Sequence, residues 1–414
     1  MLKLLKNALV LNDDFSIARR NLLIKDKYIE KISETPIENI NIDIEVNLEG
    51  HVVFPALINS HDHLIDTGWK KMGVMPVNNW YEWDASLKDC KDFNLMQRLS
   101  STDLYLCGMY KNAVSGTVTV FDHFPHEISN AFTDHPLVSL IRYYFAAHSP
   151  SKHSLQWCSD LASAYKKTMG IMPFIVHVAE GRSQELGKET ELLKRMGVLA
   201  SNTILADCAF LDEDAIEIVA NSGASISWVP LSSQNIFEKQ PPIKKIMDCG
   251  IPICIGTDAS ITGSSSLHEE FKFIKQYSKE NLNNRLSAKD ILKMVTSTPA
   301  KLFRIDKETG SITKGKLANF IIFKQNSENP ENLAEDFLNL EPALYSMVIH
   351  KGNMIIGDHE FRPLTFPDSS KYSEIWFNGL PKLIMGRPLQ LLERIAFKLE
   401  KQVVYPFFDI TSGN

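Results

Sequence analysis

The sequence predicts an α/β protein in which a (β/α)₈ TIM-like barrel carries a β-sandwich built from both ends of the chain. Short apolar strands alternate with longer helical patterns over residues 55–305, which is the rhythm of such a barrel. Strand-rich stretches broken by polar turns flank this region on both sides. The chain has 414 residues, enough for two or three domains, which agrees with a barrel and a smaller unit.

The flanking segments, residues 1–54 and 306–365, are assigned to the sandwich. Apolar strands are expected at Ala8–Leu11 and Asn21–Ile24 in the first segment and at Ala318–Phe323 in the second. Because the two segments of the sandwich come from opposite ends of the chain, we expect the barrel to be inserted between them.

The central segment contains one strand candidate after another. A helical stretch over Met96–Val114 ends at Gly116, and Ser287 and Asp290 resemble a capping box that opens another helix. A doubly wound open sheet is the competing fold, but no Gly-x-Gly-x-x-Gly follows any of the strands. The strand candidates are Thr117–Phe121, Ile141–Phe145, Phe174–Val176, Thr203–Ala206, Ala224–Trp228 and Ile251–Gly256.

The last segment, residues 366–414, is expected to be a helical extension. Its amphipathic helix candidate, Pro388–Gln402, is predicted to pack on the surface or on a partner subunit.

Composition excludes several classes of protein. Apolar residues make up 44% and charged residues 23%, which excludes a disordered or fibrous chain. The net charge of −6 argues against a nucleic-acid partner, and no run of 18 apolar residues predicts a membrane span. The six cysteines form no Cys-x-x-Cys pair, and no signal-peptide core is recognisable. We therefore expect a cytoplasmic protein with reduced thiols.

The strongest chemical signal lies at the start of the barrel segment. An apolar strand from Pro55 runs directly into His61-Asp62-His63. Residues two apart on a strand point to the same face, so both imidazoles can meet one cation. Neutral imidazole suits zinc, iron or nickel, and barrel active sites lie at the carboxyl ends of strands.

Two further strand ends carry groups of the same kind. His177 follows an apolar strand, with Glu180 three residues later, and Asp258 follows a strand and Gly256. On their own, His177 could be bonded to the backbone and Asp258 could cap the next helix. Together with His61 and His63 they supply three imidazoles and a carboxylate, and leave a position for water.

These residues resemble the amidohydrolase superfamily, in its branch of chlorohydrolases and of aromatic and cyclic-amidine deaminases. The resemblance spans nearly the whole chain. The motifs that carry it are Phe54-Pro-Ala-Leu-Ile-Asn-Ser-His-Asp-His, Gly116-Thr-Val-Thr-Val-Phe-Asp-His, Ala147-His148-Ser-Pro, His177-Val-Ala-Glu180, Gly256-Thr-Asp258, Thr298-Pro-Ala-Lys and Gly310-Ser-Ile-x-x-Gly315-Lys-x-Ala-Asn319.

The resemblance implies one divalent metal ion, with Zn²⁺ expected and Fe²⁺ or Mn²⁺ as alternatives. It implies proton transfer by one acid and substrate contact by one histidine. No lysine ends the strand Ile141–Ala147, where relatives with two metals carry a carboxylated lysine. The implied metal ligands are His61, His63, His177 and Asp258, with Glu180 as the proton carrier and His148 at the substrate.

The sequence departs from the family at the sixth barrel strand. Relatives usually end this strand in Leu-Ala-His, whereas this chain reads Leu205-Ala206-Asp207. Asp207 has three interpretations: an additional metal ligand or an acceptor behind the ligands, a partner for a cationic or NH-bearing substrate group, or a sign that hydrolysis is lost. The next motif also differs, since relatives often read Asn-Pro-x-Ser-Asn where this chain reads Val229-Pro-Leu-Ser-Ser.

The predicted reaction is hydrolysis of a C–N bond in a small nitrogenous heterocycle or amidine, with release of ammonia. In this scheme Asp258 accepts a proton from the attacking water and Glu180 protonates the leaving nitrogen. Substrate contacts are assigned to His148, Asp207 and Trp83, the last from an aromatic loop after His63 whose aromatics can equally pack the loop itself.

Other functions stay open. A specialised biosynthetic enzyme that hydrolyses a ring amide or a C–Cl bond, or catalyses cyclisation or dehydration, would use the same parts. A degenerate, non-catalytic binding protein is the second alternative. His123, after the second barrel strand, is given a structural role. The expected partners are a small-molecule substrate and a second copy of the chain in a homodimer.

Overall fold

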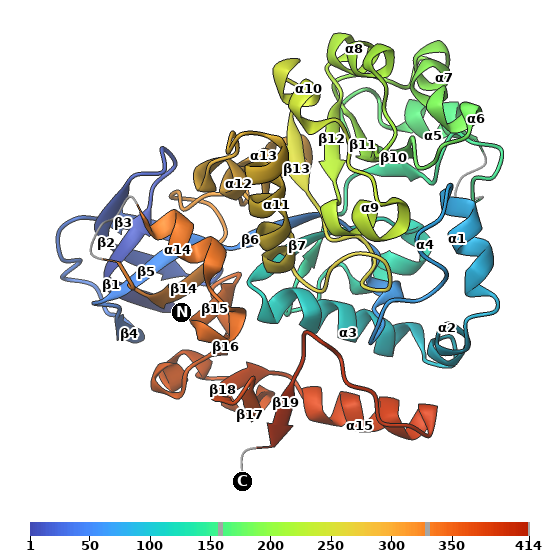
Figure 1. Cartoon of the computed structure of the whole chain (residues 1–414). Coiled ribbons are helices and arrows are strands. Elements are labelled where there is room, and N and C mark those ends of the chain that lie inside the picture. Colours follow the sequence, from blue (N-terminus) through green and yellow to red (C-terminus); the bar gives the residue numbers. More distant parts are fainter. Residues whose placement is uncertain (156–159, 328–331, 413–414) are drawn as a thin grey trace.

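The computed structural model describes residues 1–155, 160–327 and 332–412 (Figure 1). Eight of the described strands are parallel and form two sheets, one of three strands in the order β6-β7-β8 and one of five in the order β9-β10-β11-β12-β13. These strands are β6 (Leu57–Asp62), β7 (Thr117–Asp122), β8 (Ser139–Leu140), β9 (Phe145–Ala147), β10 (Phe174–Val178), β11 (Thr203–Asp207), β12 (Ser225–Trp228) and β13 (Ile253–Ile255).

Helices connect these strands and cover them, which explains why strands such as β6, β7 and β10 are buried along their whole length. The alternation of strand and helix is the one that the sequence predicts. The helices are α1 (Trp80–Leu87), α2 (Lys91–Met96), α3 (Ser101–Val114), α4 (His126–Ser129), α5 (Leu161–Lys167), α6 (Gln184–Gly187), α7 (Glu189–Arg195), α8 (Glu213–Ser222), α9 (Pro230–Phe237), α10 (Ile243–Asp248), α11 (Leu267–Asn281), α12 (Ala288–Met294) and α13 (Ser297–Leu302).

Helix boundaries follow the capping residues. Helix α3 begins at Ser101 rather than at Met96, because the Ser100 side chain accepts a hydrogen bond from Asp103 N and caps the helix there. The predicted capping box is present: Ser287 and Asp290 exchange hydrogen bonds at the start of α12.

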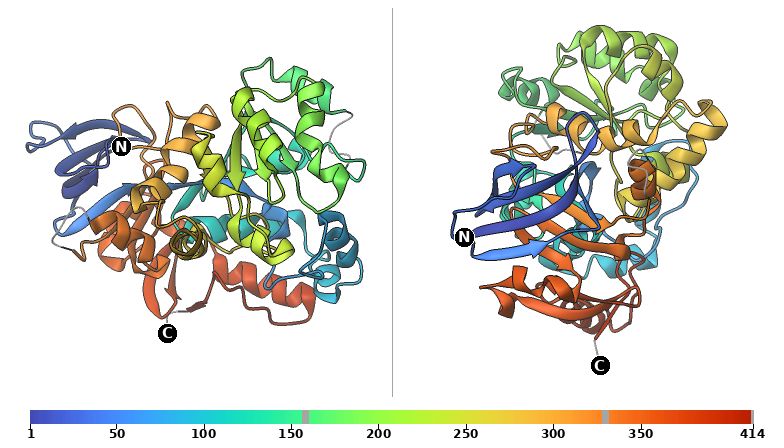
Figure 2. Two further views of the ribbon diagram at one scale, coloured as in Figure 1. Left: turned by 45° about the horizontal axis from the view of Figure 1, so that its top comes forward. Right: turned by 90° about the vertical axis from the view of Figure 1, so that its left-hand side faces the viewer.

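The two ends of the chain share one large sheet. Among the described residues eleven strands form it, and β5 pairs antiparallel with β14 with Val53 opposite Ile322. Figure 1 and the right-hand view of Figure 2 show the N-terminal strands in blue beside the orange strands of the C-terminal half. The strands are β1 (Leu2–Leu11), β2 (Ile17–Lys25), β3 (Tyr28–Ser33), β4 (Ile44–Asn47), β5 (His51–Pro55), β14 (Phe320–Lys324), β15 (Tyr345–His350), β16 (Asn353–Gly357), β17 (Tyr372–Phe377), β18 (Leu380–Met385) and β19 (Ile410–Ser412).

Alternating side chains place this sheet between two cores. Phe320 and Ile322 of β14 pack into a core within the terminal domain, together with Val53 of β5. Ile321 and Phe323 point the other way and join the core that the parallel strands and their helices share. This period of two is what a strand with both faces buried requires. The structure therefore has one continuous sheet where the sequence predicts a sandwich.

The last segment differs from the expected helical extension. It contributes β17, β18 and β19 to the large sheet in addition to helix α15 (Pro388–Leu399). Asn378 and Gly379, both with positive φ, form the turn between β17 and β18. Helix α15 ends at Leu399 rather than at Gln402, where Glu400 adopts a left-handed conformation.

Helix α15 packs on its own chain. Leu391, Ile395 and Leu399 form its buried face, and Arg394 and Lys398 both bind Asp103 of α3. Another helix, α14 (Leu333–Asn339), packs against α11 and α12.

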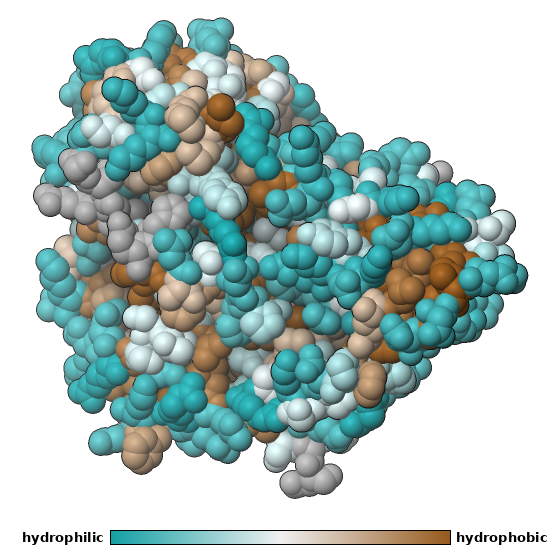
Figure 3. Space-filling view, turned by 180° about the vertical axis from the view of Figure 1, so that it is seen from behind, coloured by the Kyte–Doolittle hydropathy of each residue, from teal (hydrophilic) through white to brown (hydrophobic). Residues whose placement is uncertain are grey.

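Two of the compositional expectations can be compared with the structure. None of the described helices is both long enough and apolar enough to span a bilayer. The five described cysteines are free thiols, and Cys158 lies outside the described residues. The face shown in Figure 3 is mostly hydrophilic, in keeping with a charged-residue content of 23%.

Candidate metal centre

Three imidazole nitrogens meet at the carboxyl ends of β6 and β10. The His61 Nε2 atom lies 3.2 Å from His63 Nε2 and 3.1 Å from His177 Nε2. The carboxylate of Asp258, which follows β13, completes the group, with Oδ1 3.3 Å from His63 Nε2 and 3.7 Å from His61 Nε2. The structure thus brings together the four residues that the resemblance names as metal ligands.

The protonation of His177 is set by its neighbours. Its Nδ1 atom lies 3.2 Å from the carbonyl oxygen of His148, so Nδ1 carries the proton and Nε2 keeps its lone pair. Burial and the nearby His63 lower the pKa of His177 to about 3. Burial, His177 and His63 likewise lower the pKa of His61 well below its ordinary value. Both rings are therefore neutral at physiological pH.

Asp258 is held in place by hydroxyl groups and by the backbone. Ser232 Oγ and Thr262 Oγ1 both donate to its Oδ2 atom, which leaves Oδ1 facing the histidines. Burial alone would raise the pKa of Asp258, but His63 and His61 hold that pKa below its ordinary value. Ser232 occupies the serine position of the motif that otherwise departs from the family pattern.

Gly256 explains how this loop reaches β6. The backbone N–H of Asp258 donates to the His61 carbonyl oxygen over 3.0 Å. A Cβ atom at Gly256 would lie only 2.5 Å from the His61 Cβ atom. The close approach therefore requires glycine, and it brings Asp258 beside the histidine pair.

The donor set fits a divalent metal ion. Neutral imidazoles this close together cannot all be hydrogen-bonded to one another, because each ring has a single N–H and the His177 proton is already on Nδ1. Their spacing is close to the edge of about 3.4 Å expected for a tetrahedron with metal–nitrogen bonds of about 2.1 Å. A cation at the centre would satisfy the converging lone pairs and the carboxylate.

Asp207 and Glu180 lie directly beside this group. His177, Glu180 and Asp207 present ligand atoms that all lie within 4.8 Å of one another, and Asp207 Oδ2 is 3.5 Å from His177 Nε2. Burial and Asp258 raise the pKa of Asp207, and burial and Asp207 raise the pKa of Glu180. Asp207 therefore faces the centre at the strand end where relatives carry histidine.

Two aromatic side chains of α1 have different surroundings. Trp83 donates its indole N–H to the Met72 carbonyl oxygen over 2.9 Å and packs against Gly73 of the same loop. Trp80 lies against His148, with ring centroids 4.5 Å apart. Trp80, unlike Trp83, thus lies beside His148, whose ring is 5.3 Å from that of His177, and the substrate contact of Trp83 stays a prediction.

His123 is closer to the centre than a structural role suggests. Its ring lies 4.5 Å from that of His177 and 5.0 Å from that of His61, and it belongs to the group of four histidines that could hold a metal ion. Its Nε2 atom is 3.2 Å from the carbonyl oxygen of Ala147. The signal that could have identified it is its position directly after strand β7.

A buried ion pair fixes the residue between the two histidines of the His-x-His motif. Asp62, between His61 and His63, binds Lys111 Nζ over 2.7 Å, and both side chains are fully buried. Asn112 and Asn59 donate to the other Asp62 oxygen. These partners come from α3 and β6, so the spacing of the His-x-His motif gives no hint of them.

Backbone strain is concentrated around the same point. Ala179, Asp207, Cys208 and Asp258 all have positive φ, between 55° and 66°. Such conformations are costly for residues with a Cβ atom and persist where the surrounding structure enforces them, which is common at functional sites. Each lies at or just after a strand end that supplies a residue to the centre.

Comparison with known proteins connects this geometry to a family. The model of the Amidohydrolase family matches residues 174–355. A 5-methylthioadenosine/S-adenosylhomocysteine deaminase from Pyrococcus furiosus is 24% identical over 77% of this chain and 85% of its own length. A 5'-deoxyadenosine deaminase from Methanobrevibacter smithii is 26% identical over 79% of this chain and 85% of its own.

Solved structures share the fold. Atrazine chlorohydrolase from Arthrobacter aurescens, in complex with zinc, superimposes with a TM-score of 0.72 at 14% identity, covering 96% of this chain and 100% of its own. An adenosine deaminase from Xanthomonas campestris with bound zinc has a TM-score of 0.70 at 15% identity, covering 96% and 98%. The family model and the sequence relatives confirm the predicted resemblance to amidohydrolases and deaminases, and the solved structures show a shared fold.

Proposed function

We propose that this chain is a metal-dependent deaminase, built on a (β/α)₈ barrel, that hydrolyses a C–N bond of a nitrogenous heterocycle. The observation that carries the proposal is the convergence of three imidazole Nε2 atoms and the Asp258 carboxylate, with Glu180 beside them. His61, His63, His177 and Asp258 would hold the metal, which we expect to be Zn²⁺.

When bound, the metal ion supplies a water molecule that is deprotonated near neutral pH. Asp258 then accepts the proton of the attacking water, because its Oδ1 atom faces the same point as the three Nε2 atoms. Its Oδ2 atom is fixed by Ser232 and Thr262, so the carboxylate keeps this orientation during the reaction.

Glu180 gives a proton to the substrate nitrogen. Its raised pKa favours the protonated carboxyl group, and an amine leaves as ammonia only after protonation. Asp207 accepts a hydrogen bond from an NH group of the substrate, a role that a carboxyl oxygen can fill in either protonation state and that a protonated histidine cannot. The two acids thus divide the work of proton donor and substrate anchor.

The substrate is inferred to be a flat, amino-bearing ring of the aminopurine kind. The sequence relatives are named as deaminases of adenosine derivatives. Trp80 offers a face beside His148, and among the described residues its buried indole N–H has no hydrogen-bond acceptor. A ring nitrogen or oxygen of the substrate would satisfy that N–H.

Asp207 also favours a second candidate function. Without the sixth-strand histidine, the same parts could hydrolyse a ring amide or a C–Cl bond, or serve a biosynthetic cyclisation or dehydration. A non-catalytic binding role is the remaining alternative. The homodimer and the cytoplasmic location stay predictions.

Metal analysis is the first test. Elemental analysis of the purified protein is expected to give about one transition metal per chain. His61→Ala should lose both the metal and the activity, whereas His359→Ala, in the terminal domain, should keep both. A wild-type protein with far less than one metal, or an active metal-free His61→Ala variant, contradicts the proposal.

The reaction is tested by ammonia release. A coupled ammonia assay over adenosine, 5'-deoxyadenosine, 5-methylthioadenosine and guanine is expected to identify at least one substrate. Metal-loaded protein that releases no ammonia from any of them, but that hydrolyses a ring amide or a chlorotriazine, would select the second candidate function.

A further inference from the structure

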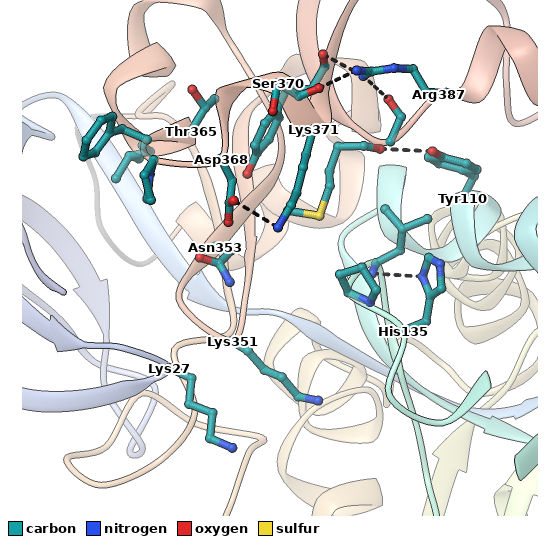
Figure 4. Close-up of a pocket in the computed structure, with 18 of the residues that line it drawn as sticks. Lys27, Tyr110, His135, Lys351, Asn353, Thr365, Asp368, Ser370, Lys371 and Arg387 are labelled. Atoms are coloured by element: carbon teal, nitrogen blue, oxygen red, sulfur yellow. Dashed lines mark hydrogen bonds and ion pairs between the residues drawn. The ribbon is translucent and has the colours of Figure 1, made fainter. Parts of the chain in front are cut away.

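A large cavity lies away from the metal centre. It has a volume of about 1030 Å³ and opens where the large sheet, the barrel region and helix α15 meet (Figure 4). Leu137, which lines it, precedes β8, so the cavity borders the amino end of a strand in the same parallel sheet as β6, which carries the histidines at its carboxyl end. Its size suits a small organic molecule.

Two lysine side chains from turns of the large sheet line this cavity. Lys27 lies in the turn between β2 and β3, and Lys351 lies in the turn between β15 and β16 (Figure 4). In the described part of the chain neither ammonium group is in a salt bridge. Burial lowers the pKa of Lys351, the nearby Asp134 raises it, and Lys27 lowers it again, so the two ammonium groups repel each other. An anion between them would relieve this repulsion.

Two further groups of the same wall are hydrogen-bond donors. His135 Nδ1 accepts a hydrogen bond from Leu137 N, so the neutral ring carries its proton on Nε2. The Asn353 amide oxygen accepts from Lys3 Nζ, so Asn353 has its NH₂ group left to offer. Both side chains line the cavity.

The carboxylates of the wall are already neutralised. Asp26 binds the amino group of Met1 over 2.6 Å, and Asp368 binds Lys371 over 3.0 Å. Arg387, which also lines the cavity (Figure 4), donates to the carbonyl oxygens of Tyr372 and Gly386. The open polar groups of the cavity are therefore donors and cations.

Lys351 is held in place at a conformational cost. It has a φ of 49°, a region that favours asparagine and glycine. The next residue, Gly352, packs closely against the neighbouring turn. A Cβ atom at this position would lie 2.3 Å from the Asp26 carbonyl oxygen. Lys351 N also donates to Asn319 Oδ1 over 2.8 Å. The fold thus fixes the backbone of Lys351 at the wall of the cavity.

The remaining wall is apolar. Leu106 and Tyr110 come from α3, Leu364 and Phe366 precede β17, and Leu391 comes from α15. Phe366 is 62% exposed, which leaves its ring open to contact with a ligand. A ligand with an apolar or aromatic body would cover these side chains.

We propose that this cavity is a second ligand site, which binds a small organic anion. Lys27 and Lys351 hold the anionic group, with His135 and Asn353 donating to it, and the apolar body lies against the α3 and α15 wall. A phosphate, sulfonate or carboxylate group meets this donor set equally well. The site is separate from the metal centre and does not depend on the proposed reaction.

The test uses two aromatic probes that differ in charge. Fluorescence titration of the full-length protein compares 1-anilinonaphthalene-8-sulfonate with the uncharged N-phenyl-1-naphthylamine. The double variant K27A/K351N removes both ammonium groups, and asparagine accepts the positive φ at position 351. We expect it to bind the sulfonate about tenfold more weakly, equivalent to about 1.4 kcal/mol, and the uncharged probe unchanged.

The matched control is Arg304→Asn, which removes an exposed cation at a φ of 60° outside this cavity. It should leave both affinities unchanged. Inorganic phosphate should displace the sulfonate from wild type but not from the double variant. If the double variant fails to fold, Lys27→Glu in the exposed turn replaces it, with at least the same loss expected. Equal weakening of both probes, or no loss for the sulfonate, overturns the proposal.

Discussion

At the carboxyl ends of β6 and β10, three imidazole lone pairs and three carboxyl groups face one another. At the amino end of β8, the cavity wall presents the ammonium groups of Lys27 and Lys351. One end of the parallel strands is thus crowded with acceptors and the other with donors. The first set of groups fits a cation, and we propose that the second binds an anion.

The two ends also differ in how they are supported. The metal centre rests on a fully buried Asp62–Lys111 pair and on strained residues such as Asp207 and Asp258. The cavity is walled by two surface turns and by helices α3 and α15, with Lys27 exposed. Rigid support suits a site that must hold reacting groups still, whereas turns suffice for binding. Four predictions test this contrast.

The largest effect is expected at Glu180. Glu180→Gln removes the proton donor and should lower kcat about 10²–10⁴-fold while the metal content stays unchanged. Steady-state kinetics and elemental analysis measure the two quantities. Glu185→Gln, an exposed acid in the same segment, is the control and should leave kcat unchanged. Loss of metal together with activity would place Glu180 among the ligands instead.

The buried support is tested by stability. Lys111→Met leaves Asp62 buried without its partner and should lower the free energy of unfolding by about 3–5 kcal/mol. Lys70→Met, which removes an exposed pair with Asp92, should change it little. Denaturant titration compares them. Adding Asp62→Asn to Lys111→Met should restore part of the loss, and equal effects of Lys111→Met and Lys70→Met would remove the contrast.

Metal removal should lower the thermal stability of the protein, because the acceptor groups of the metal centre then face one another without a cation. With free metal at about 1,000 times Kd, binding stabilises the fold by about 4 kcal/mol, which for a chain of this length is about 5 °C in Tm. Thermal unfolding with and without a chelator measures the difference. The K27A/K351N variant should show the same shift, because its substitutions lie at the other end of the strands. A chelator without effect on Tm would mean that these residues hold no metal.

The smallest effect is expected at Asp207. Asp207→Asn keeps the shape and loses the charge, and should lower kcat/KM about 10- to 100-fold through a weaker hydrogen bond to the substrate. The exposed Asp214→Asn serves as the control. Asp207→His restores the residue of the relatives, and a gain of activity on their substrates would identify Asp207 as the specificity switch. Unchanged kinetics in Asp207→Asn would exclude it from substrate binding.

The sequence was sufficient for the parts of the site that follow strand ends. His61, His63, His177 and Asp258 were predicted because each follows an apolar strand, and strand ends meet at one edge of a parallel sheet. Lys111 and Ser232 could not be predicted in the same way. Lys111 lies in α3 and Ser232 lies in α9. Their partners, Asp62 and Asp258, are 49 and 26 residues away in the chain.

The fold shows a similar division. The alternation over residues 55–305 predicted the parallel strands, but the segment after residue 366 was expected to be helical. Asn378-Gly379 is a strong hairpin signal between two apolar stretches, and it would have identified β17 and β18. These two strands extend the large sheet that both ends of the chain form. Their place in it depends on pairing between residues far apart in the sequence, which local patterns do not encode.

The shared sheet has a consequence for the time course of synthesis. Strand β5 ends at Pro55, and its partner β14 begins at Phe320. At a translation rate of about 5–20 residues per second, the ribosome needs about 13–53 s to make the residues between them. During that interval one edge of β5 has no partner on its own chain. The nascent protein therefore needs the growing barrel, or a chaperone, to shield that edge until the second half of the sheet emerges.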